Sequence, residues 1–416
     1  MPLLRARRLL AVVVLGAAFG AGAVEDPDLP DSSTDSTPQT EAETAADESS
    51  RALSLLGVDV APGTRQNLRW IAGQSFSGSD LRAPVMVVHG EAAGPALCLT
   101  GGVHGDELNG VEIVRRVLAE TTPGELRGTL IGVPIVNLMG FSSGSRYLPD
   151  RRDLNRFFPG HPRGNAASRI AHAFFNEVVR HCDLLIDLHT GSFKRSNLPQ
   201  LRANLDHAAV AEFVTHFGAT AVLHHSRERG TLRDAANAAG IAAVTFELGE
   251  PGTVQAEYVR YGVKAINTVL GRLDMLDRSH IWLERQPIYF RSRWVRAYHG
   301  GILSSPIELG TTVDEGDLLG TVINPLTNEE AEIRAPYSGR ILGRALDQFV
   351  LPGFATFHIG IETDTPAAQG TEIPDPQDLS ADDMEAPEGS ADETGVDAFI
   401  EDSLAPGAGA SMEPLP

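Results

Sequence analysis

Three residues that could bind a metal or move a proton stand together where an apolar run ends. The segment GGVHGDELNG, residues 101–110, follows an apolar run and contains His104, Asp106 and Glu107. His104 and Glu107 are three residues apart, so a helical turn after His104 lets both side chains reach one point. Imidazole nitrogen and carboxylate oxygen are good zinc ligands, and a hydrolytic zinc takes three protein ligands and leaves a position for water. A lone His-x-x-Glu pair is more often part of a surface loop, so further residues must support the metal interpretation.

Two other apolar runs end at residues that could complete such a site. His189 ends the run in LLIDLHTGS, with Asp187 two residues before it, and is the best candidate for a third ligand. Glu247 ends the run in VTFELGEPG and could be the base that takes a proton from water. The alternative for Glu247 is a helix-capping or solvated acid, as for Glu250.

The segment GSRYLPDRRDLNRFFPG is rich in charge and in turn-forming residues. A guanidinium binds a carboxylate through two hydrogen bonds, and an amide can fix the orientation of that carboxylate. The segment could therefore hold an anionic substrate, and a surface charge cluster is the alternative. The candidate binding residues in it are Arg146, Arg151, Arg152, Asp153, Asn155 and Arg156.

The chain between residues 55 and 280 alternates short apolar runs with amphipathic stretches, which predicts an α/β domain with a mostly parallel sheet covered on both faces. In such sheets ligands bind beyond the carboxyl ends of the strands, where the three motifs stand. We expect strands at residues 85–88, 96–100, 128–136, 184–188, 219–223 and 242–246, and helices at 108–120, 166–180, 206–217, 231–239 and 255–276.

Residues 281–362 differ in character, with short β-prone runs separated by glycine-containing turns. This pattern predicts a small all-β domain. The phrases VDEGDLLGTV and IRAPYSGRIL resemble the half-barrel (barrel-sandwich) fold of biotinyl and lipoyl carriers, which bear their cofactor on a lysine in the intervening hairpin. That hairpin reads NPLTNEEAE here and has no lysine, so the resemblance implies the fold and argues against the carrier function.

The N-terminus has the pattern of a secretory signal. Arginines at positions 5, 7 and 8 precede an apolar stretch that ends in Ala21-Gly22-Ala23, which predicts a signal peptide over residues 1–23, cleaved after Ala23, and a periplasmic location. A membrane anchor is the alternative, but Leu9–Phe19 is short for a span that needs about 20 apolar residues. After cleavage we expect no membrane span. The Arg7-Arg8 pair leaves general secretion and twin-arginine export both open.

The net charge of −21 is concentrated in two tails. Residues 24–50 and 363–416 contain 9 and 14 acids and no Lys or Arg, so the remainder is close to neutral. We expect disorder in a linker over residues 24–54 and in a tail over residues 363–416, because neither can bury enough apolar surface to fold. An acidic docking function for the tails is the alternative. No basic stripe suggests nucleic-acid binding.

Two cysteines occur in the chain, and both stand beside apolar residues. Cys98 lies inside one predicted strand and Cys182 precedes another. Each is therefore expected to be a small buried residue rather than half of a disulfide, and neither is expected to be a catalytic thiol.

Taken together, HGDE, RDLNR, DLHT and the glutamate of FELGE resemble the succinylglutamate desuccinylase and aspartoacylase family, relatives of the zinc carboxypeptidases. The resemblance runs from about residue 56 to residue 360. It implies a sheet of the zinc-carboxypeptidase type and a bound Zn²⁺. The implied roles are zinc ligands for His104, Glu107 and His189, catalytic base for Glu247, substrate-carboxylate binding for Asn155 and Arg156, and loop support for Asp153. Arg146-Tyr147 is similar to an oxyanion-stabilising arginine–tyrosine pair of aspartoacylases, two residues further upstream.

The reaction implied by the resemblance is hydrolysis of an amide in a small molecule that also bears a carboxylate, such as an N-acyl amino acid. An exported metallocarboxypeptidase acting on peptides is one alternative. A non-catalytic binding protein on the same scaffold is another. The acyl group, the amino acid and the oligomeric state are not predicted.

Overall fold

The computed structural model describes residues 52–361 except for residues 76, 227 and 278–286. The predicted signal peptide, the acidic tail and most of the linker lie outside the described residues. The first described strand, β1 (Leu53–Leu55), pairs with β2 (Val58–Val60), so regular structure begins two residues before the expected domain start at residue 55. Within the described ranges, no helix combines the length and the apolar character needed to cross a membrane.

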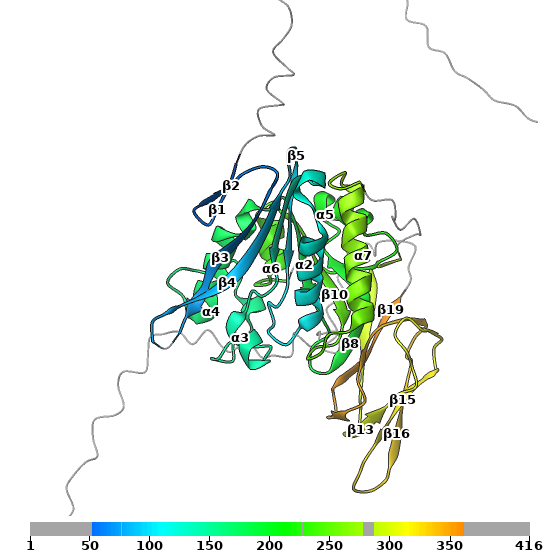
Figure 1. The fold of residues 1–416 in the computed structure, drawn as a ribbon. Coiled ribbons are helices and arrows are strands. Elements are labelled where there is room, and N and C mark those ends of the chain that lie inside the picture. The colour runs from blue at the N-terminus through cyan, green and yellow to red at the C-terminus, as the bar shows by residue number, and fades with distance from the viewer. Residues whose placement is uncertain (1–51, 76, 227, 278–286, 362–416) are drawn as a thin grey trace, which may run out of the picture. The chain divides into compact units, whose positions relative to one another are not determined.

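In this part of the chain, thirteen strands form one mixed sheet (Figure 1). Ten of them are neighbours in the order β12-β19-β17-β8-β10-β7-β5-β6-β4-β3. Its parallel centre consists of β6 (Arg127–Val133), β5 (Ala92–Thr100), β7 (Leu184–His189) and β10 (Ala242–Gly249). Antiparallel neighbours are β4 (Asp80–His89), β3 (Thr64–Gln74) and β8 (Arg195–Ala203).

The predicted α/β class is confirmed, but the expectation of a mostly parallel sheet is wrong. Strands β3 and β8 lie where no strand was expected. Only residues 190–194 separate β7 from β8, and a parallel crossover needs a dozen residues or more. The chain therefore turns back after β7, and β8 runs antiparallel to β10.

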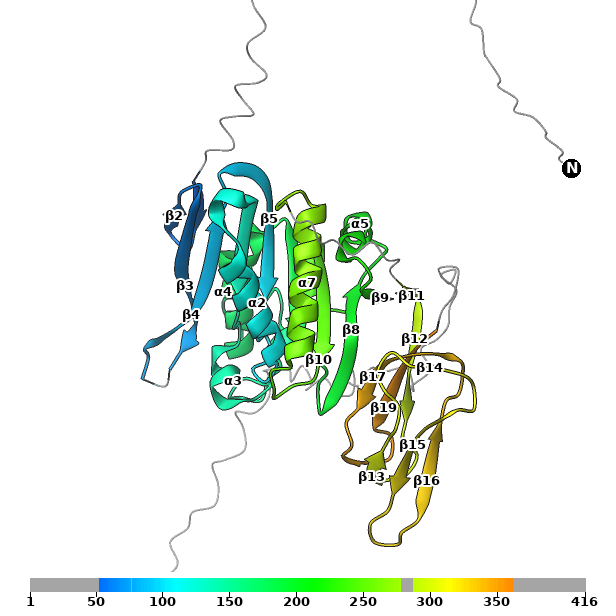
Figure 2. The same ribbon diagram turned by 45° about the vertical axis from the view of Figure 1, so that its right-hand side comes forward.

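Helices cover both faces of the sheet, as expected (Figure 2). Leu97 and Leu99 of β5 belong to the core on one face and Cys98 to the core on the other, because successive side chains of a strand alternate. The first face is covered by α2 (Leu108–Glu120), α5 (Ala208–Val214) and α7 (Ala256–Arg272), and the second by α3 (Leu138–Ser143), α4 (Ala166–Glu177) and α6 (Leu232–Ala238). Short 3₁₀ turns cover Pro123–Glu125, Leu154–Arg156, Val179–His181 and Thr215–Phe217.

The prediction for the two cysteines is wrong, because Cys98 and Cys182 form a disulfide. Their Cα atoms are 5.7 Å apart and both side chains are buried. The residues are 84 positions apart in the chain, but β5 and β7 are parallel neighbours, so the start of β7 lies beside the middle of β5. The apolar surroundings were correctly predicted, whereas the pairing depends on a strand order that the sequence does not reveal.

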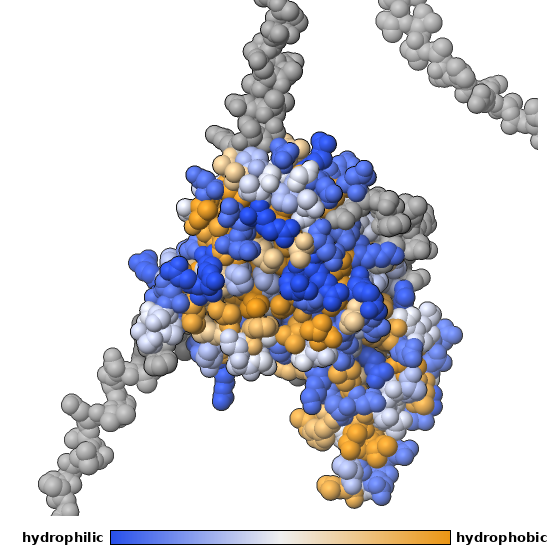
Figure 3. Space-filling view, in the orientation of Figure 1, coloured by the Kyte–Doolittle hydropathy of each residue, from blue (hydrophilic) through white to orange (hydrophobic). Residues whose placement is uncertain are grey.

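The region after residue 286 is all β, as predicted. Strand β11 (Ile288–Tyr289) pairs with β9 (Ala221–His224), and β17 pairs with β8, so the sheet continues from one region into the other. A second sheet of β16, β15, β13 and β18 packs across a shared core that includes Leu303, Val322 and Phe357. We call residues 287–361 the β module; its other strands are β12 (Arg291–Arg296), β13 (Gly301–Ser304), β14 (Thr312–Val313), β15 (Leu318–Ile323), β16 (Glu330–Arg334), β17 (Gly339–Ala345), β18 (Phe349–Val350) and β19 (Ala355–Ile361). Exposed apolar side chains, among them Ile302 and Phe349, gather on this module near β13 (Figure 3).

Candidate metal centre

The loop between β5 and α2 carries two of the predicted ligands. Glu107 directly precedes α2 and donates its backbone N–H to the carbonyl of His104, which closes a turn between them. Nδ1 of His104 therefore lies 2.9 Å from Oε1 of Glu107. Glycine is required at position 105, since a Cβ there would overlap the backbone of Gly140.

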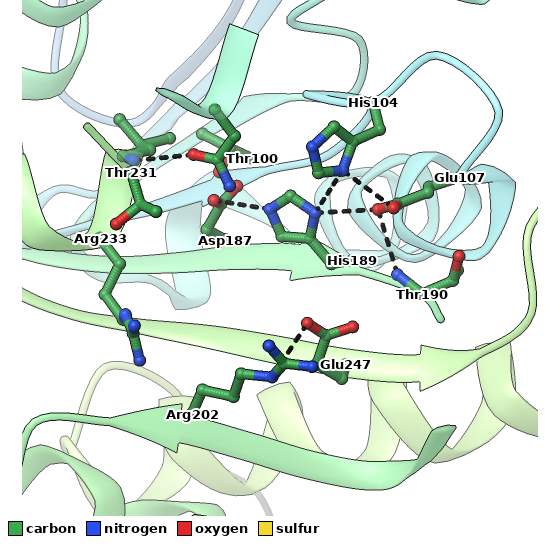
Figure 4. A network of polar contacts seen from close by, with 12 residues as sticks. Thr100, His104, Glu107, Asp187, His189, Thr190, Arg202, Thr231, Arg233 and Glu247 are labelled. Carbon is green, nitrogen blue, oxygen red and sulfur yellow. Dashed lines mark hydrogen bonds and ion pairs between the residues drawn. The ribbon is translucent and has the colours of Figure 1, made fainter. Parts of the chain in front are cut away.

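The end of β7 brings the third predicted ligand to the same point. Nδ1 of His189 is 2.8 Å from Oε2 of Glu107 and 3.1 Å from Nδ1 of His104. All three side chains are buried, and one ligand atom from each lies within 4.8 Å of the others. Figure 4 shows the two imidazoles and the carboxylate turned toward one another.

The spacing and chemistry of these atoms fit a bound metal. Two imidazole nitrogens that face each other repel unless a proton or a cation lies between them. Their separations are close to the edge of a tetrahedron, roughly 3.3 Å for a metal bound at about 2.0–2.1 Å. His104, Glu107 and His189 could therefore hold a metal ion.

The charges of these three groups depend on one another. Burial would raise the pKa of Glu107, but His104 and His189 hold that pKa well below its usual value. Burial would lower the pKa of His189, but Asp187 and Glu107 raise it well above its usual value. A metal cation at this point would take the place of the positive charge that a protonated imidazole supplies.

Each histidine also contacts a carboxylate through its other ring nitrogen. Nε2 of His189 lies 2.8 Å from Oδ2 of Asp187, whose Oδ1 accepts a hydrogen bond from the Thr100 hydroxyl at 2.6 Å. Nε2 of His104 lies 3.1 Å from Oδ1 of Asp153. Such carboxylates fix the ring orientation of metal-binding histidines, so that Nδ1 is the free ligand atom.

Sequence reasoning gave Asp187 no role and gave Asp153 only loop support. Asp187 could have been recognised, because residues two apart on a strand share a face. Asp153 could not have been recognised from the sequence, because it is 49 residues away from His104 in the chain.

Arg146 lies beside the three candidate ligands. Its Nη1 is 3.3 Å from Oε1 of Glu107 and its Nη2 is 2.9 Å from Oδ2 of Asp153. The guanidinium carbon stands 5.6 Å from the centre of the Phe193 ring. The buried arginine is thus held next to the cluster by two carboxylates, where it could stabilise negative charge.

Glu247 faces the same cavity from β10. It is the register partner of His189 in the parallel β7–β10 pair. Its Oε2 accepts a hydrogen bond from Nδ2 of Asn197 at 3.1 Å, and its Oε1 lies 3.3 Å from Nε of Arg202 (Figure 4). The structure therefore places the predicted base beside a predicted ligand, and it adds two β8 residues that sequence reasoning missed.

One cavity connects these groups with the predicted substrate-binding residues. Asn155 and Arg156 line it, although Oδ1 of Asn155 accepts a hydrogen bond from the backbone of Leu232 at 2.8 Å. Further lining residues were given no functional role by the sequence: Arg195 and Asn197 of β8, Glu228 before α6, Arg233 of α6, and Trp294 of the β module. The cavity is thus strongly polar and rich in arginine.

Comparison with known proteins agrees with the motifs. Residues 93–273 match the family model of the succinylglutamate desuccinylase/aspartoacylase catalytic domain. The N-alpha-acetyl-L-2,4-diaminobutyric acid deacetylase of Halomonas elongata is 31% identical over 278 residues, which cover 63% of this chain and 80% of that enzyme. The chain belongs to the succinylglutamate desuccinylase and aspartoacylase family. The resemblance predicted from the motifs is therefore confirmed.

Two further proteins extend the likeness. A succinylglutamate desuccinylase of Pseudomonas aeruginosa is 27% identical over 228 residues, which cover 51% of this chain and 58% of that enzyme. The product-bound structure of the ectoine utilization protein EutE from Ruegeria pomeroyi matches with a TM-score of 0.64 and 27% identity, covering 72% of this chain and 95% of that one. The matched fold thus accounts for nearly all of EutE.

Proposed function

We propose that this protein is a zinc-dependent deacylase that hydrolyses the amide bond of an N-acyl amino acid. The observation that carries the proposal is the convergence of His104, Glu107 and His189 on one buried point, with Glu247 beside His189. Two imidazoles and one carboxylate are the protein ligands of several hydrolytic zinc sites. The names of two family members, the diaminobutyric acid deacetylase and the succinylglutamate desuccinylase, both describe removal of an acyl group.

Zinc held by His104, Glu107 and His189 would act as a Lewis acid and would lower the pKa of a bound water to about 7. Glu247 accepts the proton of the attacking water and delivers it to the departing amine. Arg146 stabilises the negative charge that develops on the carbonyl oxygen. Asn155 and Arg156 hold the substrate carboxylate and thereby orient the amide.

Zinc content and substrate preference, measured on the same purified full-length chain, test this proposal. We expect about one zinc per chain by elemental mass spectrometry, and release of acetate or another acyl group from N-acyl amino acids that stops on chelation. Dipeptides with the same C-terminal residue should be poor substrates. Cleavage of peptides alone would favour a carboxypeptidase, and the absence of both zinc and turnover would favour a binding protein.

We propose that the protein is exported to the periplasm. The residues predicted to form a signal peptide support this, as does the buried Cys98–Cys182 disulfide, because disulfides persist in oxidising compartments. N-terminal sequencing of the protein from a periplasmic extract should find a chain that begins after Ala23. An intact N-terminus in the cytoplasmic fraction would refute export.

We propose that the β module has the half-barrel fold of biotinyl and lipoyl carriers without their cofactor. The two sheets around one core support the fold, and the hairpin between β15 and β16 has no lysine to modify. Intact-mass measurement should find no biotinyl or lipoyl addition. A mass increase of either size would refute the second part of the proposal.

A further inference from the structure

Three arginines and two glutamates line the cavity on the side of Glu247. Arg202 lies 3.3 Å from Glu247. Glu228, in the loop before α6, contacts the other two arginines: its Oε1 is 3.5 Å from Nη1 of Arg156 and its Oε2 is 3.2 Å from Nη2 of Arg233. All five side chains line the cavity. These five side chains therefore carry one net positive charge, and Arg195, which also lines the cavity, adds another.

The ionisation of the neighbouring groups supports this count. Burial and Arg233 lower the pKa of His225 to about 4, so this histidine, 3.4 Å from the Arg233 guanidinium, adds no charge at neutral pH. Burial would raise the pKa of Glu228, but the basic groups around it, His225 and Arg233 among them, outweigh that effect and lower it. The Glu228 side chain is therefore ionised at neutral pH.

Glu228 also occupies Arg233, the arginine that a second substrate carboxylate would need when Arg156 binds the first. The Arg233 side chain is 3% exposed, and its Nη1 is buried without a hydrogen-bond partner among the described residues. A second carboxylate near Arg233 would approach the Glu228 carboxylate. In a partly buried site such like-charge proximity is costly.

We infer that Glu228 restricts this protein to N-acyl amino acids that bear a single carboxylate, with no negative charge on the side chain or on the acyl group. The first substrate carboxylate binds at Arg156, whereas a second would stand beside the Glu228 carboxylate at Arg233, which already forms an ion pair. The inference rests on the proposed function for its substrate class. It separates N-acyl amino acids with a single carboxylate, such as acetyldiaminobutyrate, from those with more than one, such as succinylglutamate. Specificity here comes from a repulsive group as much as from attractive ones.

N-acetyl-L-glutamine and N-acetyl-L-glutamate test this inference, because they have nearly the same shape and differ in one negative charge. We expect the wild-type protein to have the higher kcat/KM for the glutamine derivative. Glu228→Gln should raise the glutamate-to-glutamine ratio of kcat/KM by about tenfold or more, as expected for removal of a nearby like charge. Glu228→Asp, which keeps the charge, should retain the wild-type preference.

Glu212→Gln is the matched control, because it makes the same change of charge on the exposed surface of α5 and should leave the ratio unchanged. The ratio does not depend on the fraction of molecules that fold, so partial misfolding of a variant cannot mimic the result. An unchanged ratio in Glu228→Gln would overturn the inference.

Binding of free glutamine and glutamate, measured by calorimetry on the same proteins, separates this inference from the proposed function. If no N-acyl amino acid is hydrolysed, the proposed function fails. A preference for glutamine that Glu228→Gln reverses would still support the role of Glu228 in charge selection. Equal binding of the two amino acids by the wild type would overturn that role.

Discussion

Glu247 of β10 lies directly opposite His189 of β7 in their parallel register. Neighbouring strands are about 4.8 Å apart, so backbone hydrogen bonds fix the distance between these two residues. Asn197 of β8 holds the Glu247 carboxylate from the other side. The proposed base and a proposed ligand thus stand on rigid strands rather than on loops, as a site that must hold its geometry requires.

Glu247→Gln should keep the metal and lose most of the turnover. The amide has nearly the same shape as the carboxylate but cannot accept a proton, and general-base catalysis contributes about 10²–10⁴-fold to rates. Zinc content and kcat, measured on one preparation, check this expectation. Glu250→Gln, three residues further along and outside the cavity lining, is the control and should remain active. Full activity of Glu247→Gln would refute the role assigned to Glu247.

Asp187→Asn should weaken metal binding without removing any ligand. The Asp187 carboxylate contacts Nε2 of His189 and orients the ring, and loss of such a partner costs about 10–100-fold in metal affinity. Competition with a chromogenic chelator gives the affinity. Asp183→Asn is the control, because Asp183 is exposed beside the other end of β7 and should leave the affinity unchanged. Equal affinities for Asp187→Asn and the wild type would contradict the positioning role.

The sequence predicted the groups at the strand ends because their chemistry and their place in the chain agree. His104, His189 and Glu247 each follow an apolar run, and the carboxyl ends of parallel strands meet at one edge of a sheet. Helix α2 was predicted at its observed bounds, since the buried positions Ile113, Val114 and Val117 repeat at helical spacing.

The rest of the site depends on strand pairing, which local patterns do not encode. Strand β8 reads RSNLPQLRA, and its side chains are mostly buried. Its polar residues and proline do not form the apolar pattern from which a buried strand is predicted. Asn197 and Arg202 reach Glu247 only because β8 pairs with β10. For the same reason the disulfide was missed: Cys98 and Cys182 meet through the pairing of β5 with β7.

Removing the disulfide should lower the free energy of unfolding. Cys98→Ala/Cys182→Ala should cost about 2–5 kcal/mol, because the crosslink restricts the unfolded chain. Urea unfolding of wild type and variant, each with and without reductant, measures this difference. Reductant should destabilise the wild type and leave the variant unchanged. If reductant leaves the urea midpoint of the wild type unchanged, the disulfide does not contribute to the free energy of unfolding.

His358 should make the protein less stable in acid. It is buried and stacks on Trp294, with ring centres 4.8 Å apart. Burial, then Arg202 and His225, lower the pKa of His358 to about 3, while an unfolded chain has a histidine pKa of about 6.5. The unfolded state therefore takes up the proton first, and the stabilising contribution of neutral His358, complete above about pH 6.5, is lost as the pH falls toward 3.

His358→Phe isolates this effect, because phenylalanine keeps an aromatic ring against Trp294 and does not titrate. The free energy of unfolding should fall more steeply for the wild type than for the variant between pH 6.5 and 4, by up to about 1.4 kcal/mol per pH unit. Denaturant unfolding at several pH values measures both slopes. Parallel curves would mean that His358 is not held neutral in the folded protein, and a wild type that is stabilised by acid would reverse the sign argued above.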